Sequence, residues 1–419
     1  MHRPSPGFGD FVARHRAART LIVQPRMGFS DPLLMRAGLA ATRTARAATA
    51  GTVTVDSYTR TGDLAAAATA LANRQPLNGY PIVNHSAETT QHLLAGLHDA
   101  DFPVQVRHGS ANPVRIITSM IAAGLSATEG GPISYCLPYS RMPLRQAVAE
   151  WARSCRLLSH QRETGAEPHL ESFGGCMLGQ LCPPSMLIAI TVLEAMFFRQ
   201  NGLRSVSLSY AQQTDFGQDH GAIAALRAIA AERLGDLDWH IVLYTYMGLF
   251  PASVAGASRL QADAATLAAW SGVDRLIVKT SVEARRLPSV AENVEALEAA
   301  AAVAAAVGGV ASPVDDRIRT EAETIIDSVL DLRDDIGGAL VEAFDRGRLD
   351  VPYCLHPDNP GRATSRLDQH GRLQWLETGG LAISGDPQAS HAKRISSAHL
   401  LESLSYVRRR YDHDLVEER

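Results

Sequence analysis

The sequence predicts an α/β protein that folds as a TIM (β/α)8 barrel with a C-terminal α+β extension packed on it. Short β-rich runs alternate with helix-compatible stretches as far as residue 280, which is typical of a parallel sheet with helices outside. No GxGxxG follows the first predicted strand, and this disfavours an open dinucleotide-binding sheet. A chain of 419 residues that is 46% hydrophobic can bury a core of this size.

Nine runs are candidate strands, one more than a closed eight-stranded barrel needs. Most are rich in Val, Ile and Tyr, whereas the runs at 124–131 and 169–175 are weaker. The nine runs cover residues 20–25, 52–58, 80–85, 103–108, 124–131, 169–175, 205–210, 240–246 and 275–280. The sequence does not indicate which of them lies outside the barrel.

The pattern changes after the last of these runs. Two long helices are predicted from "AENVEALEAAAAVAAAVGG" and "RTEAETIIDSVLDLRDDIGGALVEAF", then a hairpin around "DQHGRLQWLE" and a final helix near 391–411. We therefore divide the chain into an N-terminal segment (1–19), a barrel catalytic domain (20–320) and a C-terminal extension (321–419).

Composition argues against several classes of protein. A net charge of −4 disfavours a nucleic-acid binder, and no apolar run approaches the ~20 residues that span a bilayer. The first residues lack the apolar core of a signal peptide, so we expect a cytoplasmic protein. The five cysteines form no CxxC pair, so we predict buried free thiols and no metal site.

Arginines follow three of the predicted strands. Arg26, Arg60 and Arg107 come at or just after strand ends, and the carboxyl ends of barrel strands open onto one face, where active sites lie. Guanidinium groups bind carboxylates through two hydrogen bonds, so we predict a small ligand with more than one carboxylate or phosphate. The absence of a glycine-rich phosphate loop favours carboxylates. Surface arginines are the alternative, because only two of the 40 basic residues are lysines.

The stretch "TEGGPISYCLPY" adds an acid and two phenols to the predicted site. Glu129 could pair with a substrate ammonium group or accept one of its protons. Tyr135 and Tyr139 could donate hydrogen bonds to carboxylates, and His108 could reach the same anion. The alternatives are interior tyrosines with satisfied hydroxyls, a structural histidine, and a glutamate that caps backbone amides.

One of the two lysines is also at a strand end. In "RLIVKTSVE", Lys279 follows a predicted strand and Glu283 lies four residues later. The lysine could form a Schiff base or act as a compact hydrogen-bond donor. A lysine–glutamate pair can hold a sugar diol, although an ordinary ion pair explains the spacing equally well.

These motifs together resemble the catalytic (epsilon) subunit of glutamate mutase, also called methylaspartate mutase. The resemblance covers roughly residues 20–385. The motifs that carry it, in order, are "QPRMG", "DSYTR", "LNGYP", "RHG", "EGGPISYCLPY", "PPS", "MGLFP" and "VKTSVEARRLP". The resemblance implies a TIM-barrel isomerase that uses adenosylcobalamin to interconvert L-glutamate and threo-3-methyl-L-aspartate by a radical rearrangement. It also implies a homodimer of this chain joined by a small cobalamin-binding subunit with a DxHxxG motif, in a heterotetramer.

The resemblance also implies roles for single residues. Arg26, Arg60 and Arg107 would hold the two substrate carboxylates, and Glu129 would meet the amino group as the catalytic residue. The remaining substrate-pocket positions are His108, Tyr135 and Tyr139. The positions that match the surroundings of the cofactor are Gly28, Asn78, Pro138, Phe173, Phe250, Lys279, Glu283 and Leu287.

The sequence departs from the family pattern in two places. The usual "HQWMG" is "YTYMG" here, so Tyr244 and Tyr246 replace a histidine and a tryptophan, and the loop "SYAQQTDFGQDHG" is longer. These changes leave open a related mutase or epimerase that acts on another amino dicarboxylate. A non-catalytic barrel that binds amino acids is a further alternative.

Overall fold

The computed structural model describes residues 7–177, 179–310, 313–384 and 396–417. Eight parallel strands form one sheet in the order β1-β8-β7-β6-β5-β4-β3-β2. The strands are β1 (Ile22–Pro25), β2 (Gly51–Thr54), β3 (Val104–Arg107), β4 (Ala127–Gly130), β5 (His169–Ser172), β6 (Ser205–Ala211), β7 (Asp238–Tyr244) and β8 (Arg275–Val278). The two end strands approach each other at a parallel bridge between Val23 and Thr49, so the sheet is nearly closed. The predicted barrel fold is confirmed.

Eight of the nine candidate runs overlap these strands, and the run at 80–85 does not. Tyr80 forms one isolated bridge with Val55, after which the chain turns at Pro81. The Pro81 carbonyl accepts hydrogen bonds from the N–H groups of Asn84 and His85, which closes that turn. The prediction of a strand at 80–85 was therefore wrong.

The position of Arg60 also differs from the prediction. Strand β2 ends at Thr54, and Asp56 caps a short helix, α3 (Ser57–Thr61), by accepting hydrogen bonds from the N–H groups of Tyr58 and Thr59. An aspartate in this position favours helix initiation over a continued strand. Arg60 is thus carried by a helix and not by a strand end.

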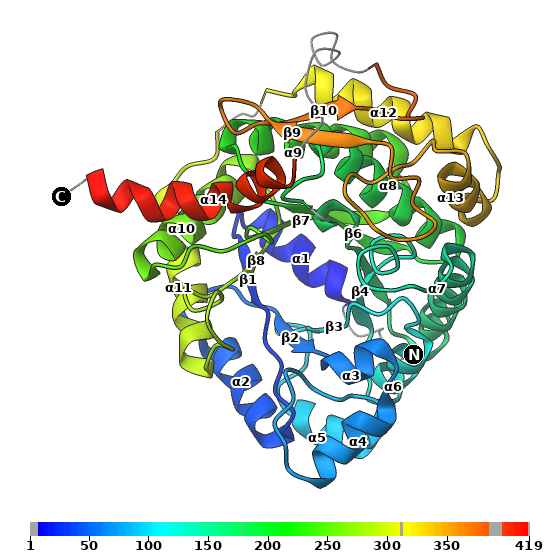
Figure 1. Ribbon diagram of the computed structural model, residues 1–419. Coiled ribbons are helices and arrows are strands. Elements are labelled where there is room, and N and C mark those ends of the chain that lie inside the picture. The colour runs from blue at the N-terminus through cyan, green and yellow to red at the C-terminus, as the bar shows by residue number, and fades with distance from the viewer. Residues whose placement is uncertain (1–6, 178, 311–312, 385–395, 418–419) are drawn as a thin grey trace.

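Helices surround the sheet (Figure 1). They are α2 (Pro32–Thr44), α4 (Leu64–Ala72), α5 (Ala87–Leu94), α6 (Val114–Ala122), α7 (Leu144–Ser159), η1 (His160–Thr164), η2 (Gly174–Cys176), α8 (Pro184–Gln200), α9 (Phe216–Arg233), α10 (Val254–Ser271) and α11 (Val290–Ala306). Helix α8 is apolar on nearly all sides, and residues 184–198 are buried. A helix of this kind needs cover on every face, and α9 and the C-terminal extension supply it.

The C-terminal extension consists of α12 (Asp316–Leu330), α13 (Ile336–Asp345), the antiparallel hairpin β9 (Thr364–Leu367) and β10 (Leu373–Glu377), and α14 (Ser397–Glu417). The predicted hairpin is confirmed. The second long helix was predicted as one continuous helix, but the structure has two, α12 and α13. Asp335 caps the start of α13 by accepting a hydrogen bond from the N–H of Gly338. Helix α12 packs on α8 and α14 packs on α10 (Figure 1).

The N-terminal helix α1 (Phe8–Ala17) covers the amino ends of the strands. Phe8 is buried with Ile22, Ala50 and Ala127, which lie at or next to the starts of β1, β2 and β4. Its ring stacks on that of His169, with centroids 4.9 Å apart, and the Arg275 guanidinium lies 4.8 Å from its centroid. Helix α1 therefore closes the barrel at the end opposite the carboxyl ends of the strands. Within the described residues, no helix is long and apolar enough to cross a membrane.

We predict that Phe8→Ala lowers the free energy of unfolding by about 3–5 kcal/mol, because it removes a buried ring and leaves a cavity beneath the barrel. Arg14→Ala on the same helix removes a surface ion pair with Asp101 and should cost less than about 1 kcal/mol. Urea unfolding of both variants checks this. Equal, small losses would show that α1 is not a structural part of the barrel.

Candidate active site

The centre of the candidate site is a buried ion pair at the carboxyl ends of β3 and β4. The Arg107 Nη2 atom lies 2.7 Å from Glu129 Oε2. The Tyr244 hydroxyl, at the end of β7, lies 2.8 Å from Arg107 Nη1 and 2.8 Å from the same Glu129 oxygen. Arg107 is 4%, Glu129 2% and Tyr244 0% exposed. The barrel thus brings together a cation, an acid and a phenol from three separate strands.

Burial sets the protonation behaviour of Glu129. Removal from water raises the pKa of this carboxyl, Arg107 opposes the change, and the neighbouring Glu171 adds to it. Glu171 is next to Glu129 because the register of β4 and β5 pairs these two residues. A carboxyl whose pKa is raised in this way binds a proton more readily than an exposed carboxyl.

The glycines after Glu129 allow the next side chains to approach it. A Cβ on Gly130 would lie 2.4 Å from the Trp151 ring and 2.6 Å from the Tyr135 ring. Tyr135 is buried and its hydroxyl donates a hydrogen bond to Glu129 Oε1. Tyr139 lies nearer the rim, 47% exposed, with its ring centroid 6.0 Å from that of Tyr135.

A second buried acid, which the sequence reasoning missed, holds this loop in place. Glu194 on α8 accepts hydrogen bonds from the N–H groups of Ile133 and Ser134 and from the hydroxyls of Ser134 and Ser172. A Cβ on Gly131 would lie 2.1 Å from its carboxylate. Burial raises the pKa of Glu194 to about 7. A single acid within an otherwise apolar helix was the available sequence signal.

His108 has a free hydrogen-bond donor within the site. The N–H of Ser110 donates to its Nδ1, so the ring proton is on Nε2. Burial and the charge of Arg107 lower the pKa of His108 to about 3, which keeps the ring neutral. Among the described residues, Nε2 has no hydrogen-bond partner although it is buried. An unpaired buried donor next to Arg107 can serve an anionic ligand.

Arg26 and Arg60 lie further out and line one pocket of about 490 Å³. Arg26 Nη1 is 3.4 Å from Glu283 Oε1. Arg60 is exposed and passes over Gly109, where a Cβ would lie 2.9 Å from its Cδ atom. Other predicted site residues that line this pocket are Gly28, Asn78, Glu283 and Leu287. The structure therefore gathers Arg26 and Arg60 at the rim and places Arg107 deeper.

A neighbouring pocket of about 510 Å³ is lined by Phe250, Lys279 and Glu283. Lys279 Nζ lies 3.4 Å from Glu283 Oε1 and 5.1 Å from the centroid of the Phe250 ring. Burial lowers the pKa of Lys279 to about 8, although Glu283 opposes this shift. Helix α14 adds Arg408 to this pocket, a residue that the sequence reasoning missed.

Two predicted cofactor residues lie elsewhere. Phe173 is buried beside the phenols, with ring centroids 5.1 Å from Tyr135 and 5.5 Å from Tyr244. Pro138 is partly buried, immediately before Tyr139. Neither lines the two rim pockets described above.

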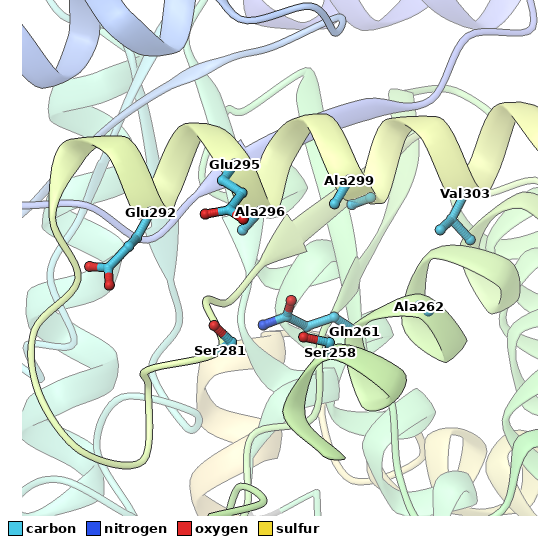
Figure 2. A pocket seen from close by; sticks show the side chains of 10 residues that line it. Ser258, Gln261, Ala262, Ser281, Glu292, Glu295, Ala296, Ala299 and Val303 are labelled. Atoms are coloured by element: carbon cyan, nitrogen blue, oxygen red, sulfur yellow. The ribbon is translucent and has the colours of Figure 1, made fainter. Parts of the chain in front are cut away.

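A further pocket, of about 230 Å³, lies between α10 and α11 (Figure 2). Its polar lining includes Gln261 and Ser281, with Glu292 and Glu295 on α11, and the rest is mostly alanine. Within the described part of the chain, none of its lining residues belongs to the predicted site. We therefore treat it as separate.

The fold and these residues define an α/β barrel with a buried cluster of charged side chains and phenols at the carboxyl ends of its strands. The sequence matches the methylaspartate mutase E chain (MutE) family over residues 5–405. It is 33% identical to the glutamate mutase epsilon subunit of Halobacterium salinarum, over 82% of this chain and 74% of that protein. The epsilon subunits of Desulfitobacterium hafniense and Haloarcula marismortui are 32% and 31% identical over 82% of this chain, and over 74% and 72% of their own lengths.

The chain therefore belongs to the methylaspartate mutase E chain family. This confirms the resemblance that the motifs indicated. A mutase is an isomerase, so family membership places the chain among the isomerases.

We predict that Lys279 titrates with a midpoint of about 8 in the folded protein. Since this is below its ordinary value of 10.5, the free energy of unfolding should rise as the pH increases from about 8 to 10.5. Lys279 and Lys393 are the only lysines in the sequence. Reductive methylation with isotope-labelled formaldehyde therefore gives few NMR signals, and the chemical shift of each can be followed as the pH is raised. Lys279→Arg assigns the low-midpoint signal. Two lysine signals that both titrate near 10.5 would contradict the predicted shift.

Proposed function

We propose that this chain is the catalytic subunit of an adenosylcobalamin-dependent mutase that interconverts L-glutamate and threo-3-methyl-L-aspartate. The observation that carries the proposal is the buried pair of Arg107 and Glu129, 2.7 Å apart, in a member of this family. One partner can receive a carboxylate and the other an ammonium group, which are the two groups on the α-carbon of an amino acid.

The second carboxylate of the substrate would be held nearer the rim. Arg26 and Arg60 line the same pocket and are both arginines, which suit bidentate binding of a carboxylate. His108 Nε2, next to Arg107, and the hydroxyl of Tyr139, nearer the rim, provide neutral hydrogen-bond donors. These residues support an amino dicarboxylate as the ligand class.

The residues proposed to hold the cofactor fit an adenosyl group. Lys279 and Glu283 offer a donor and an acceptor 3.4 Å apart, which suits a ribose diol. Phe250 and the 63% exposed Leu287 offer apolar surface on either side of Glu283 for a base. When bound, adenosylcobalamin supplies the carbon radical that removes a hydrogen atom from an unactivated C–H bond.

The residues of this chain would bind, orient and shield the substrate. Arg107 fixes one carboxylate, and binding at two remote groups keeps the reacting carbon in one orientation. Glu129 would accept a hydrogen bond from the substrate ammonium group as a carboxylate. The burial of Arg107, Glu129, Tyr135 and Tyr244 excludes water, which protects a reactive radical.

The proposed enzyme also needs a second chain. The sequence contains no DxHxxG; "QDHG" at 218–221 and "DQHG" at 368–371 have the wrong spacing. We propose that a small subunit carrying this motif binds the cobalamin, and that two copies of each chain form a heterotetramer.

Reconstitution tests the function. The chain, a small DxHxxG subunit and adenosylcobalamin should together convert L-glutamate to 3-methylaspartate, detected by NMR. The chain with the cofactor alone should bind it weakly and show no turnover. Full activity without the small subunit would contradict the two-chain proposal. Turnover of a different amino dicarboxylate, with none of L-glutamate, would favour the related mutase or epimerase that the Tyr244 departure leaves open.

We predict that Arg107→Lys lowers kcat/KM by tenfold or more. The change keeps the charge and loses the two-pronged hydrogen bond, which is worth about 1.5–3 kcal/mol with a charged partner, and each ~1.4 kcal/mol is a factor of ten. Arg227→Lys on α9 is the control, because within the described residues Arg227 donates to the carbonyls of Ser271 and Gly272, at the end of α10 and away from the site. Unchanged kcat/KM in Arg107→Lys, with a normal melting temperature, would remove Arg107 from the site.

A further inference from the structure

Tyr244 contacts three charged groups through a single hydroxyl. Arg107 Nη1 donates to the phenol oxygen at 2.8 Å. Glu129 Oε2 lies 2.8 Å from the same oxygen, and Glu171 Oε1 is also within hydrogen-bond distance of it. All four side chains are buried, so water does not compete for these contacts.

The hydrogen atoms at this position can be counted. A phenol has one proton and can donate it to one acceptor only. With Arg107 as a donor, the phenol oxygen still faces two carboxyl oxygens and has one proton for them. The second contact therefore needs a proton on one of the two carboxyl groups, because two bare oxygens at this distance repel each other.

The surroundings of the two acids decide which one holds this proton. Glu171 Oε2 accepts from Arg275 Nη2, from Gln105 Nε2 at 3.2 Å and from Ser207 Oγ at 3.3 Å. Although burial opposes it, the charges of Arg275 and Arg107 lower the pKa of Glu171. Glu171 is thus held as a carboxylate.

Glu129 has fewer charged donors. Arg107 is its cationic partner, and the other groups that face it are the hydroxyls of Tyr135 and Tyr244 and the carboxylate of Glu171. The Cys176 thiol is also close to this cluster, and burial raises its pKa well above the ordinary value, so it is neutral. The pKa of Glu129 is raised chiefly by burial.

We infer that Glu129, Tyr244 and Glu171 hold two protons between them in the ligand-free site, that Tyr244 keeps its own and Glu129 carries the second, and that Tyr244 is the residue that positions Glu129 against Arg107. The consequence for catalysis rests on the proposed function, whereas the proton itself does not. When a substrate ammonium group takes its place beside Glu129, the acid becomes a carboxylate and one proton leaves for the solvent. Ligand binding and proton release are then coupled one to one.

Infrared spectroscopy of the full chain tests for the proton on Glu129 and needs neither cofactor nor turnover. At neutral pH, the spectrum of the wild type minus that of Glu129→Gln should contain the carbonyl band of a protonated acid. Subtraction is necessary because Asp219 and Glu194 are buried acids with raised pKa values as well. A difference spectrum with only carboxylate bands would overturn the inference.

A matched pair of tyrosine variants tests the role of Tyr244. Tyr244→Phe should shift the acid band, whereas Tyr246→Phe should not, because among the described residues the Tyr246 hydroxyl has no hydrogen-bond partner. This pair needs no Glu129 variant, so the test survives if Glu129→Gln fails to fold. An unshifted band in Tyr244→Phe would overturn the positioning role.

Kinetics and calorimetry of the assembled enzyme test the consequence. Tyr244→Phe should lower kcat by about tenfold to a hundredfold, the value of a hydrogen bond to a charged group, with a smaller change in KM. Tyr246→Phe should match the wild type. The binding enthalpy of L-glutamate, measured by calorimetry in buffers of different ionisation enthalpy, gives the number of protons released. We expect about one proton per site, the proton that Glu129 loses. A protonated Glu129 in a protein that does not bind L-glutamate would uphold the inference and reject the proposed function, so the two failures are distinguishable.

Discussion

The site depends on the burial of Arg107 against Glu129. A charge removed from water, such as that of Arg107, is unfavourable unless it keeps close partners and further hydrogen bonds. Here the added partners come from other strands and loops: Tyr244 bonds to both side chains, and Tyr135 bonds to Glu129. Because the pair needs all of these groups, their positions are fixed relative to one another. A ligand that enters meets Arg107 and Glu129 already ordered to receive its carboxylate and its ammonium group.

The glycine-rich loop and the outer layers follow from this constraint. Only glycine at 130 and 131 leaves room for Tyr135, Trp151 and the carboxylate of Glu194. Glu194 lies on α8, which α12 covers from outside. The C-terminal extension therefore supports the site through α8. Helix α14 also reaches the rim of the site directly. There Asp412 accepts hydrogen bonds from the N–H groups of Ala252 and Ser253, which lie close to Phe250 in the sequence.

Local patterns predicted most of the fold and the polar members of the site. Alternating β and α runs gave the barrel, because a buried parallel strand has a strong apolar signal. The run at 80–85 has the same composition, and only the turn at Pro81 distinguishes it. Glu171, Glu194 and Arg275 were missed as partners, because their importance comes from strand register and helix packing, which bring together residues far apart in sequence. The environment of Tyr244 could not be predicted for the same reason.

The most direct measurement is a crystal structure of the chain, or of its assembly with the small subunit, with L-glutamate bound. The account predicts that Arg107 turns its Nη2 from Glu129 to a ligand carboxylate, and that the ligand amino group lies within hydrogen-bond distance of Glu129. The second carboxylate should contact Arg26 or Arg60. L-Glutamate bound elsewhere, with the contact between Arg107 and Glu129 unchanged, would contradict the account.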